Sequence, residues 1–147
     1  MSSENNFLEP LENWASIYLY RSLTEFFNYL KVTGISMQQV YVLTYIYYNG
    51  PSKISELCEH MMVSAPATSQ MVDRLEKQNL VERIAHPADR RVRNVVLSGE
   101  GEKFVKESIE ARQSWVKEIP ATLTDSQIDQ ISAALEILIS IYREKPE

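Results

Sequence analysis

Apolar residues recur at helical spacing over most of this chain. From about Pro10 to Lys31 they fall three to five positions apart, which predicts a long first helix. Ser36 is followed three residues later by Gln39, a capping-box pattern that predicts the start of a second helix. That helix ends at the turn sequence Asn49-Gly50-Pro51. The front of the chain is therefore predicted to be helical.

Two shorter helices follow the second one closely. Apolar spacing predicts a third helix over residues 54–61, and Ser64 with Pro66 marks the start of a fourth. The fourth helix is predicted to reach about Gln78, because Asn79 tolerates the left-handed backbone that ends helices. One face of it carries an apolar stripe at positions i, i+3, i+4 and i+7, made of Thr68, Met71, Val72 and Leu75. Two helices joined by so short a turn are typical of a helix-turn-helix.

The periodicity then changes from helical to alternating and back again. Residues 80–85 and 92–97 alternate like strands and are separated by turn residues, which predicts a β-hairpin. A fifth helix is predicted from Ser98-Gly99 to about Ile119, where Pro120 breaks it. A sixth is predicted from Asp125 to about Arg143, behind a second capping pattern. A hairpin directly after a helix-turn-helix is a wing, so the predicted fold is a mainly α winged helix-turn-helix.

The fourth helix presents a polar face opposite its apolar stripe. In helix-turn-helix proteins the second helix of the motif fits the major groove of DNA. Small residues near its start permit close approach, a serine hydroxyl can bond a phosphate, and the amide of Gln70 suits adenine. The predicted DNA contacts of this helix are Ser64, Ala65, Pro66, Ser69, Gln70 and Arg74.

Net charge is −5, which on its own argues against a nucleic-acid partner. The distribution changes that interpretation. Residues 53–93 carry seven basic and six acidic side chains, whereas the rest of the chain carries eight basic and fourteen acidic ones. Phosphate contact requires a local basic patch rather than a basic protein. The densest cluster is Arg90, Arg91 and Arg93 on the predicted hairpin, and these are predicted DNA contacts.

Several segments together resemble one known family, the MarR-type transcriptional regulators. Residues 35–43 are similar to the start of that family's second helix, and residues 71–83 to its recognition-helix exit and first wing strand. Residues 87–91 (PADRR), followed by LSGEG at 97–101, are similar to its wing motif and the lead into the next helix. The resemblance covers about residues 10–145. One departure is Asn79, where the family usually has glycine.

The resemblance implies a homodimeric regulator, often a repressor, on a pseudo-palindromic DNA operator. Residues 1–34 and 99–147 would form a helical dimerisation region, and residues 35–98 the DNA-binding region. In the family an arginine at the wing tip enters the minor groove, and an aspartate braces the wing by pairing with an arginine. Arg90 and Arg91 are both candidates for the first role, and Asp89 is the candidate for the second.

Eleven of the fourteen aromatic residues lie within residues 7–48. Packing in the core and the dimer explains most of them. The resemblance adds a second interpretation, because relatives bind small aromatic or phenolic effectors between the dimer helices and the winged helix. The candidate effector residues are Trp14, Tyr18, Arg21, Tyr41 and Tyr45.

Other chemistry finds little support in the sequence. Cys58 is the single cysteine, and we expect a buried structural thiol rather than a redox sensor. Two histidines, His60 and His86, predict no metal site, and neither a cofactor motif nor a catalytic motif is present. With no membrane span or signal peptide, a cytoplasmic location is expected. A rival interpretation is a winged-helix protein–protein module without DNA affinity, which the acidic net charge mildly favours.

Overall fold

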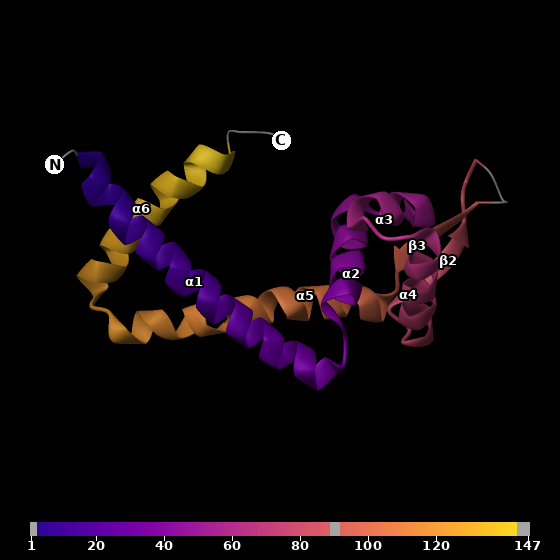
Figure 1. Ribbon diagram of the computed structural model, residues 1–147. Coiled ribbons are helices and arrows are strands. Elements are labelled where there is room, and N and C mark those ends of the chain that lie inside the picture. Colours follow the sequence, from indigo (N-terminus) through magenta and orange to yellow (C-terminus); the bar gives the residue numbers. More distant parts are fainter. Residues whose placement is uncertain (1–2, 89–91, 144–147) are drawn as a thin grey trace. The chain divides into compact units, whose positions relative to one another are not determined.

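The computed structural model describes residues 3–88 and 92–143. The chain divides into two compact units, Met1–Arg112 and Gln113–Glu147. In chain order the elements are α1 (Ser3–Thr33), α2 (Met37–Asn49), β1 (Ser52–Lys53), α3 (Ile54–Met61), α4 (Ala65–Lys77), β2 (Val81–Ala85), β3 (Arg93–Leu97), α5 (Gly99–Gln113), the 3-10 helix η1 (Ser114–Thr122) and α6 (Asp125–Arg143) (Figure 1). This order confirms the predicted mainly α fold with a wing.

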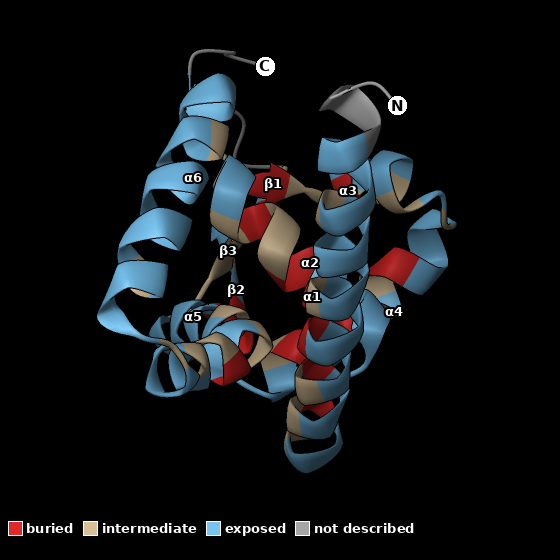
Figure 2. Cartoon of the chain, turned by 90° about the vertical axis from the view of Figure 1, so that its left-hand side faces the viewer, coloured by how far each residue is buried: buried red, intermediate tan, exposed pale blue. Residues whose placement is uncertain are grey.

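Helix α1 is longer than predicted. It begins at Ser3, and Pro10, the predicted first residue, lies inside it. The prediction failed because proline is usual at the first turn of a helix, and here the helix continues through it. Buried positions gather in the C-terminal half of α1 (Figure 2). There the ring of Tyr29 packs on Phe104 of α5, with ring centroids 5.7 Å apart.

Helix α2 is the central element of the first unit, and its predicted boundaries are confirmed. The N–H of Ser36 donates to Oε1 of Gln39 at 2.9 Å, and the N–H of Gln39 donates back to the Ser36 hydroxyl, so the capping box is complete. At the other end Gly50 adopts a φ of 76°, which glycine reaches without steric cost. Much of α2 is buried, including Val42, Leu43 and Ile46.

The sheet has three strands in the order β1-β3-β2, and both pairings are antiparallel. The hairpin β2–β3 was predicted, whereas β1 was not. β1 is only two residues long, with Ser52 opposite Val95. Two residues are too few to show an alternating pattern, so periodicity alone misses this strand.

The core of the first unit is one cluster contributed by every helix of that unit and by the sheet. Its fully buried members include Leu43 of α2, Leu57 of α3, Val72 and Leu75 of α4, and Val105 of α5. At roughly 1.5–3 kcal/mol for each large side chain, this burial dominates the stability of the unit. The core therefore fixes the position of α4 through its inward face.

The second unit departs from prediction in one element. The α-helix ends at Gln113, and a 3-10 helix that contains Pro120 follows, whereas the sequence predicted one α-helix to Ile119. Proline lacks the N–H that an α-helix needs and restricts the residue before it. Proline can therefore disturb the helix only over the turn before it, and the earlier change at Ser114 has no local signal in the sequence. Helix α6 begins as predicted, with the N–H of Thr124 donating to Oε1 of Gln127 at 2.9 Å.

Candidate nucleic-acid interface

Helices α3 and α4 and the turn between them form the predicted helix-turn-helix. Met62 ends α3 in the left-handed conformation, with a φ of 53°, and turns the chain. Ser64 then caps α4, its hydroxyl accepting from the N–H of Ala67 at 3.4 Å. Pro66 lies in the first turn of α4, where a backbone N–H has no acceptor within the helix, so the N–H that proline lacks is not needed there.

Helix α4 separates an inward face from an outward one. Thr68, Val72 and Leu75 are buried, and the Thr68 hydroxyl donates to the Ser64 carbonyl oxygen at 3.2 Å. Of the residues predicted to contact DNA, Ser64, Ala65, Pro66, Gln70 and Arg74 are exposed, and Ser69 is half-buried. The Ser64 hydroxyl is engaged in capping, so Gln70 and Arg74 are the long polar side chains that this face offers.

The β2–β3 hairpin follows α4 and forms the wing. Its ladder ends with Ala85 opposite Arg93, and Arg93 is exposed. Past the ladder, the N–H of His86 donates to the Val92 carbonyl oxygen at 2.9 Å. The N–H of Ala88 donates to Nδ1 of His86 at 3.2 Å. The other predicted wing residues, Asp89, Arg90 and Arg91, lie outside the described residues.

Arg83 is a residue that the sequence reasoning missed. It lies in β2, and its guanidinium pairs with two carboxylates of α4, Asp73 at 2.5 Å and Glu76. A signal for it was present, because the two acidic residues are three apart on one helix and an arginine follows in the next strand. Arg83 thus joins the recognition helix directly to the wing.

The C-terminal end of α4 is connected on its other sides as well. Gln39 is the glutamine of the α2 capping box, and its Nε2 donates to Oε1 of Gln78 at 3.0 Å. Asn79 has a φ of 57°, as predicted, and its carbonyl oxygen accepts from the Ser98 hydroxyl at the start of α5. The N–H of Ser98 in turn donates to the Leu80 carbonyl oxygen at 3.1 Å. The recognition helix is therefore held by α2, by β2 and by the residues leading into α5.

The candidate effector residues lie in different surroundings. Tyr41 is exposed on α2, while the ring of Tyr45 packs on that of His60 in α3, with centroids 4.4 Å apart and planes tilted by 51°. Tyr41 and His60 line a hollow of about 390 Å³ with residues of α2, α3 and the following turn. Trp14, Tyr18 and Arg21 are on α1, where Trp14 and Arg21 are exposed and Tyr18 is half-buried. The lining of that hollow includes none of the three α1 residues.

Arg112 of α5 is a second residue that the sequence reasoning missed. Its guanidinium lies 4.0 Å from the centre of the Phe26 ring. Burial lowers the pKa of Arg112 from its ordinary value, and the nearby hydroxyls of Tyr48 and Tyr18 partly offset this. The side chain thus meets aromatic groups from α1 and α2, and no carboxylate of the described residues forms an ion pair with it. Only spatial proximity reveals this cluster, because its members are far apart in sequence.

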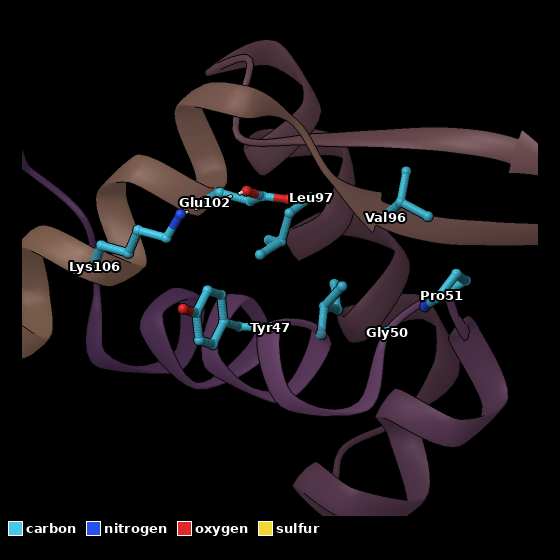
Figure 3. Close-up of a pocket in the computed structure, with 8 residues that line it drawn as sticks. Tyr47, Gly50, Pro51, Val96, Leu97, Glu102 and Lys106 are labelled. Atoms are coloured by element: carbon cyan, nitrogen blue, oxygen red, sulfur yellow. Dashed lines mark ion pairs between the residues drawn. The ribbon is translucent and has the colours of Figure 1, made fainter.

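A further hollow of about 360 Å³ lies between α2, β3 and α5 (Figure 3). Its walls include Tyr47, Pro51 and Leu97. Lys106 is its basic residue, and it pairs with Glu102 at 3.8 Å. Glu102 already compensates the positive charge of Lys106, so the hollow offers an anion little electrostatic attraction.

Metal and thiol chemistry remain minor features. Over residues 3–88 and 92–143 the structure shows no group of three metal-binding side chains. Cys58 is half-buried rather than buried as predicted. Of the residues on the apolar face of α3, only Leu57 is fully buried, so sharing the face did not ensure burial of Cys58.

Helix-turn-helix, wing and flanking helices together define a winged helix-turn-helix protein. The family model of the MarR family matches residues 35–92. Over 128 residues the chain is 33% identical to the HTH-type transcriptional regulator YsmB of Bacillus subtilis, covering 82% of this chain and 86% of that protein. The chain belongs to the MarR family, a family of DNA-binding transcriptional regulators.

Two further comparisons agree with this assignment. The chain is 27% identical to the HTH-type transcriptional repressor MdtR of Bacillus subtilis over 130 residues, covering 88% of this chain and 84% of that protein. The solved structure of the transcriptional regulator Tm0710 from Thermotoga maritima aligns with a TM-score of 0.81 at 27% identity, covering 92% of this chain and 95% of that chain. Across the described residues, no helix has the length and apolar character needed to span a membrane.

Proposed function

We propose that this protein is a homodimeric, sequence-specific repressor that binds a pseudo-palindromic operator. The observation that carries the proposal is the division of α4, which is buried at Thr68, Val72 and Leu75 and exposed at Gln70 and Arg74. A helix so divided can be held by the core while its polar face enters the major groove. MdtR, whose name describes a repressor, supports the choice of repression.

Each predicted contact has a role in this binding mode. Ala65 and Pro66 permit close approach at the start of α4, Ser64 and Ser69 lie near phosphates, and Gln70 reads a base edge. Arg74 and Arg93 contact phosphates from the helix and the wing. Arg90 and Arg91 are the minor-groove candidates and Asp89 the wing brace, an assignment that rests on the wing motif of the family.

The dimer is proposed to form through residues 1–34 and 99–147, leaving residues 35–98 to bind DNA. Exposed apolar side chains support this choice. In α1 they include Phe7, Trp14 and Ile17, and in α6 they include Ile131 and Leu135. Isolated exposed apolar residues are ordinary, whereas long stripes of them mark interfaces. A second copy of the chain is the partner that an inverted-repeat operator requires.

We also propose that a small phenolic or aromatic anion releases the repressor by binding at Arg112. The half-buried guanidinium and the hydroxyls of Tyr18 and Tyr48 provide one charge and two polar groups, and the buried Phe26 ring lies directly beneath the guanidinium. An aromatic carboxylate matches this set, because a planar guanidinium binds carboxylates through two nitrogens. Of the predicted effector residues, Tyr18 belongs to this cluster. Tyr45 packs on His60 of α3 and Tyr41 is exposed on α2, so neither is assigned an effector contact in this proposal.

The first test is in-vitro selection from a random duplex library at about 0.15 M salt, a physiological level of screening. Enrichment of an inverted repeat, with half-sites about 34–36 Å apart, is the expected result. Failure to enrich any sequence, with a protein that is folded and dimeric and free of bound ligand, would contradict the proposal and favour the protein-interaction module instead.

The effector is tested separately by titrating benzoate, 4-hydroxybenzoate and phenol against the complex of protein and selected duplex. We expect the carboxylates to release the DNA and phenol to be much weaker. Arg112→Gln should lose the response to carboxylates while binding the duplex normally. Release that is equally effective in Arg112→Gln would exclude this site.

A further inference from the structure

We propose that Arg83 is a positioning residue for DNA recognition. Its ion pairs with Asp73 and Glu76, here called the lock, hold the wing against the recognition helix α4 and neutralise two carboxylates on that helix. The inference builds on the proposed function, because it explains how the two DNA-reading elements act as one. Arg83 is not assigned a contact with DNA. Its effect is exerted through Asp73 and Glu76.

Both terminal nitrogens of the Arg83 guanidinium are paired with a carboxylate. Nη2 of Arg83 lies 2.5 Å from Oδ1 of Asp73, and Nη1 donates to Oε2 of Glu76. The two carboxylates come from successive turns of α4, and Arg83 comes from the middle of β2, opposite Val95. The arginine side chain is 25% exposed, against 52% for Asp73 and 41% for Glu76. The cation is therefore the more enclosed partner and lies between the helix and the strand.

The charge of α4 makes this pairing important for binding. The helix carries Asp73 and Glu76 against Arg74 and Lys77, so it has no positive excess of its own. Duplex DNA carries about one negative charge for each 1.7 Å of its axis. Within a screening length of about 8 Å, two unpaired carboxylates would repel it. Arg83 supplies the charge that compensates them from outside the helix.

The directionality of the pairing constrains the wing. A planar guanidinium that bonds two acceptors fixes both distance and orientation, whereas a lysine ammonium acts as a single point charge. The wing and α4 must reach the duplex at the same time for both sets of contacts to form. A lock between them fixes that relative position before DNA is bound, which lowers the ordering cost on binding.

Three variants separate the electrostatic role from the positioning role. Arg83→Lys keeps the charge and loses the fork. Arg83→Gln loses both and leaves Asp73 and Glu76 unpaired. The triple variant D73N/E76Q/R83Q has no lock and no unpaired charge. Urea unfolding is measured for each, and the triple variant serves as the folded reference if Arg83→Gln is unstable.

Affinity is measured for the duplex selected with the wild-type protein and for a random-sequence duplex of equal length. Arg83→Gln should bind both about tenfold or more weakly, because the unpaired carboxylates of Asp73 and Glu76 then repel the duplex. Arg83→Lys and the triple variant should retain affinity for the random duplex but lose several-fold for the selected one. Wild-type affinity of Arg83→Gln for both duplexes would overturn the proposal. Full affinity of the triple variant for the selected duplex would overturn the positioning role.

Hydrogen exchange of the free protein provides a readout that needs no DNA. The β2–β3 amides should exchange faster in Arg83→Gln and in the triple variant than in the wild type, while the amides of α1 remain unchanged. If the wild-type protein selects no sequence but this difference is present, the lock exists and the proposed function fails. If exchange at the hairpin is unaffected, the lock itself is refuted.

Discussion

At the scale of single residues, Gly101 in the first turn of α5 allows that helix to lie close against the DNA-binding region. A Cβ atom built at this position would overlap the carbonyl oxygen of Leu80, a backbone atom that cannot rotate away. Its own N–H donates to the Ser98 hydroxyl at 3.0 Å. The absence of a side chain therefore allows α5 to start directly against the chain that leaves α4.

We predict that Gly101→Ala lowers the free energy of unfolding by about 1–3 kcal/mol, because the backbone must shift to relieve the overlap. Gly99→Ala is the matched control, since a Cβ there meets no described atom within 4 Å. It should change stability by less than about 0.5 kcal/mol. Urea unfolding monitored by circular dichroism measures both. Equal stability of the two variants would refute the close approach at Leu80.

The outward face of α4 and the wing should differ in what they contribute to binding. Gln70→Ala is expected to weaken the selected duplex by about 1–3 kcal/mol and to leave the random duplex nearly unchanged, because it removes a base contact. Arg93→Ala should weaken both duplexes alike and reduce the log–log salt slope by about one, because it removes a phosphate contact. Fluorescence anisotropy at several salt concentrations distinguishes them. The reverse pattern would exchange the two roles.

Residue-level prediction from the sequence succeeded where a local rule applied. The apolar stripe of α4 identified its inward positions, and the tolerance of Asn79 for a positive φ identified the helix end. Arg83 and Arg112 were missed because their partners come from other elements. Their roles depend on which chains the fold brings together, and hydrophobic periodicity carries no information about that pairing.

Elements were predicted best where capping and periodicity agreed, as they did for α2, α4 and α6. Errors occurred where one signal was used without the other. Pro10 alone predicts a helix start although no cap precedes it, and Pro120 alone predicts a simple stop although the chain tightens into a 3-10 helix before it. Strand β1 exists only because β3 supplies its partners, so no local pattern predicts it.

The packing of α1 on α5 predicts a dependence of stability on alkaline pH. Burial, together with the hydrogen bond to Glu107 and the charge of that residue, raises the pKa of Tyr29 to about 12. The hydroxyl donates to Oε2 of Glu107 at 3.2 Å. In the unfolded chain the pKa of a tyrosine is about 10. Between these values the folded protein retains a proton that the unfolded chain has lost, so this contribution is complete below about pH 10 and is lost by about pH 12.

Tyr29→Phe isolates the effect, because the two proteins differ only in the Tyr29 hydroxyl. The wild type should be more stable than the variant at pH 9, and the difference in unfolding free energy should shrink between pH 10 and pH 12. Urea titrations at pH 9, 10.5 and 11.5 measure that difference. A difference that stays constant over this range would show that packing against α5 does not raise the pKa of Tyr29.

At the scale of the whole molecule, helix α6 stands out because most of its apolar side chains are exposed. None of the residues of this helix, Asp125–Arg143, is buried (Figure 2). Apolar residues recur at helical spacing along it, and they are solvent-exposed at Ile131, Leu135 and Ile139. An amphipathic helix draws most of its stability from burying its apolar face. The exposed stripe is thus the strongest argument within the second unit for a dimer.

We predict that Leu135→Asp weakens the dimer by about 100-fold or more. Leu135 is 44% exposed in the single chain, so the substitution costs the monomer little. In a twofold interface each substitution acts on both copies, and placing two unpaired carboxylates where two leucines were buried costs more than the roughly 2.8 kcal/mol that a 100-fold change represents. Sedimentation equilibrium measures the dissociation constant. The control is Ser126→Asp, because Ser126 is also exposed and lies nine positions before Leu135, which places it on the opposite face of α6 beside the polar residues Asp129 and Gln130. Because the two half-sites of an operator are bound together only by a dimer, Leu135→Asp should lose the preference for an inverted repeat over a single half-site. A variant that remains dimeric and keeps that preference would place the interface elsewhere in the chain.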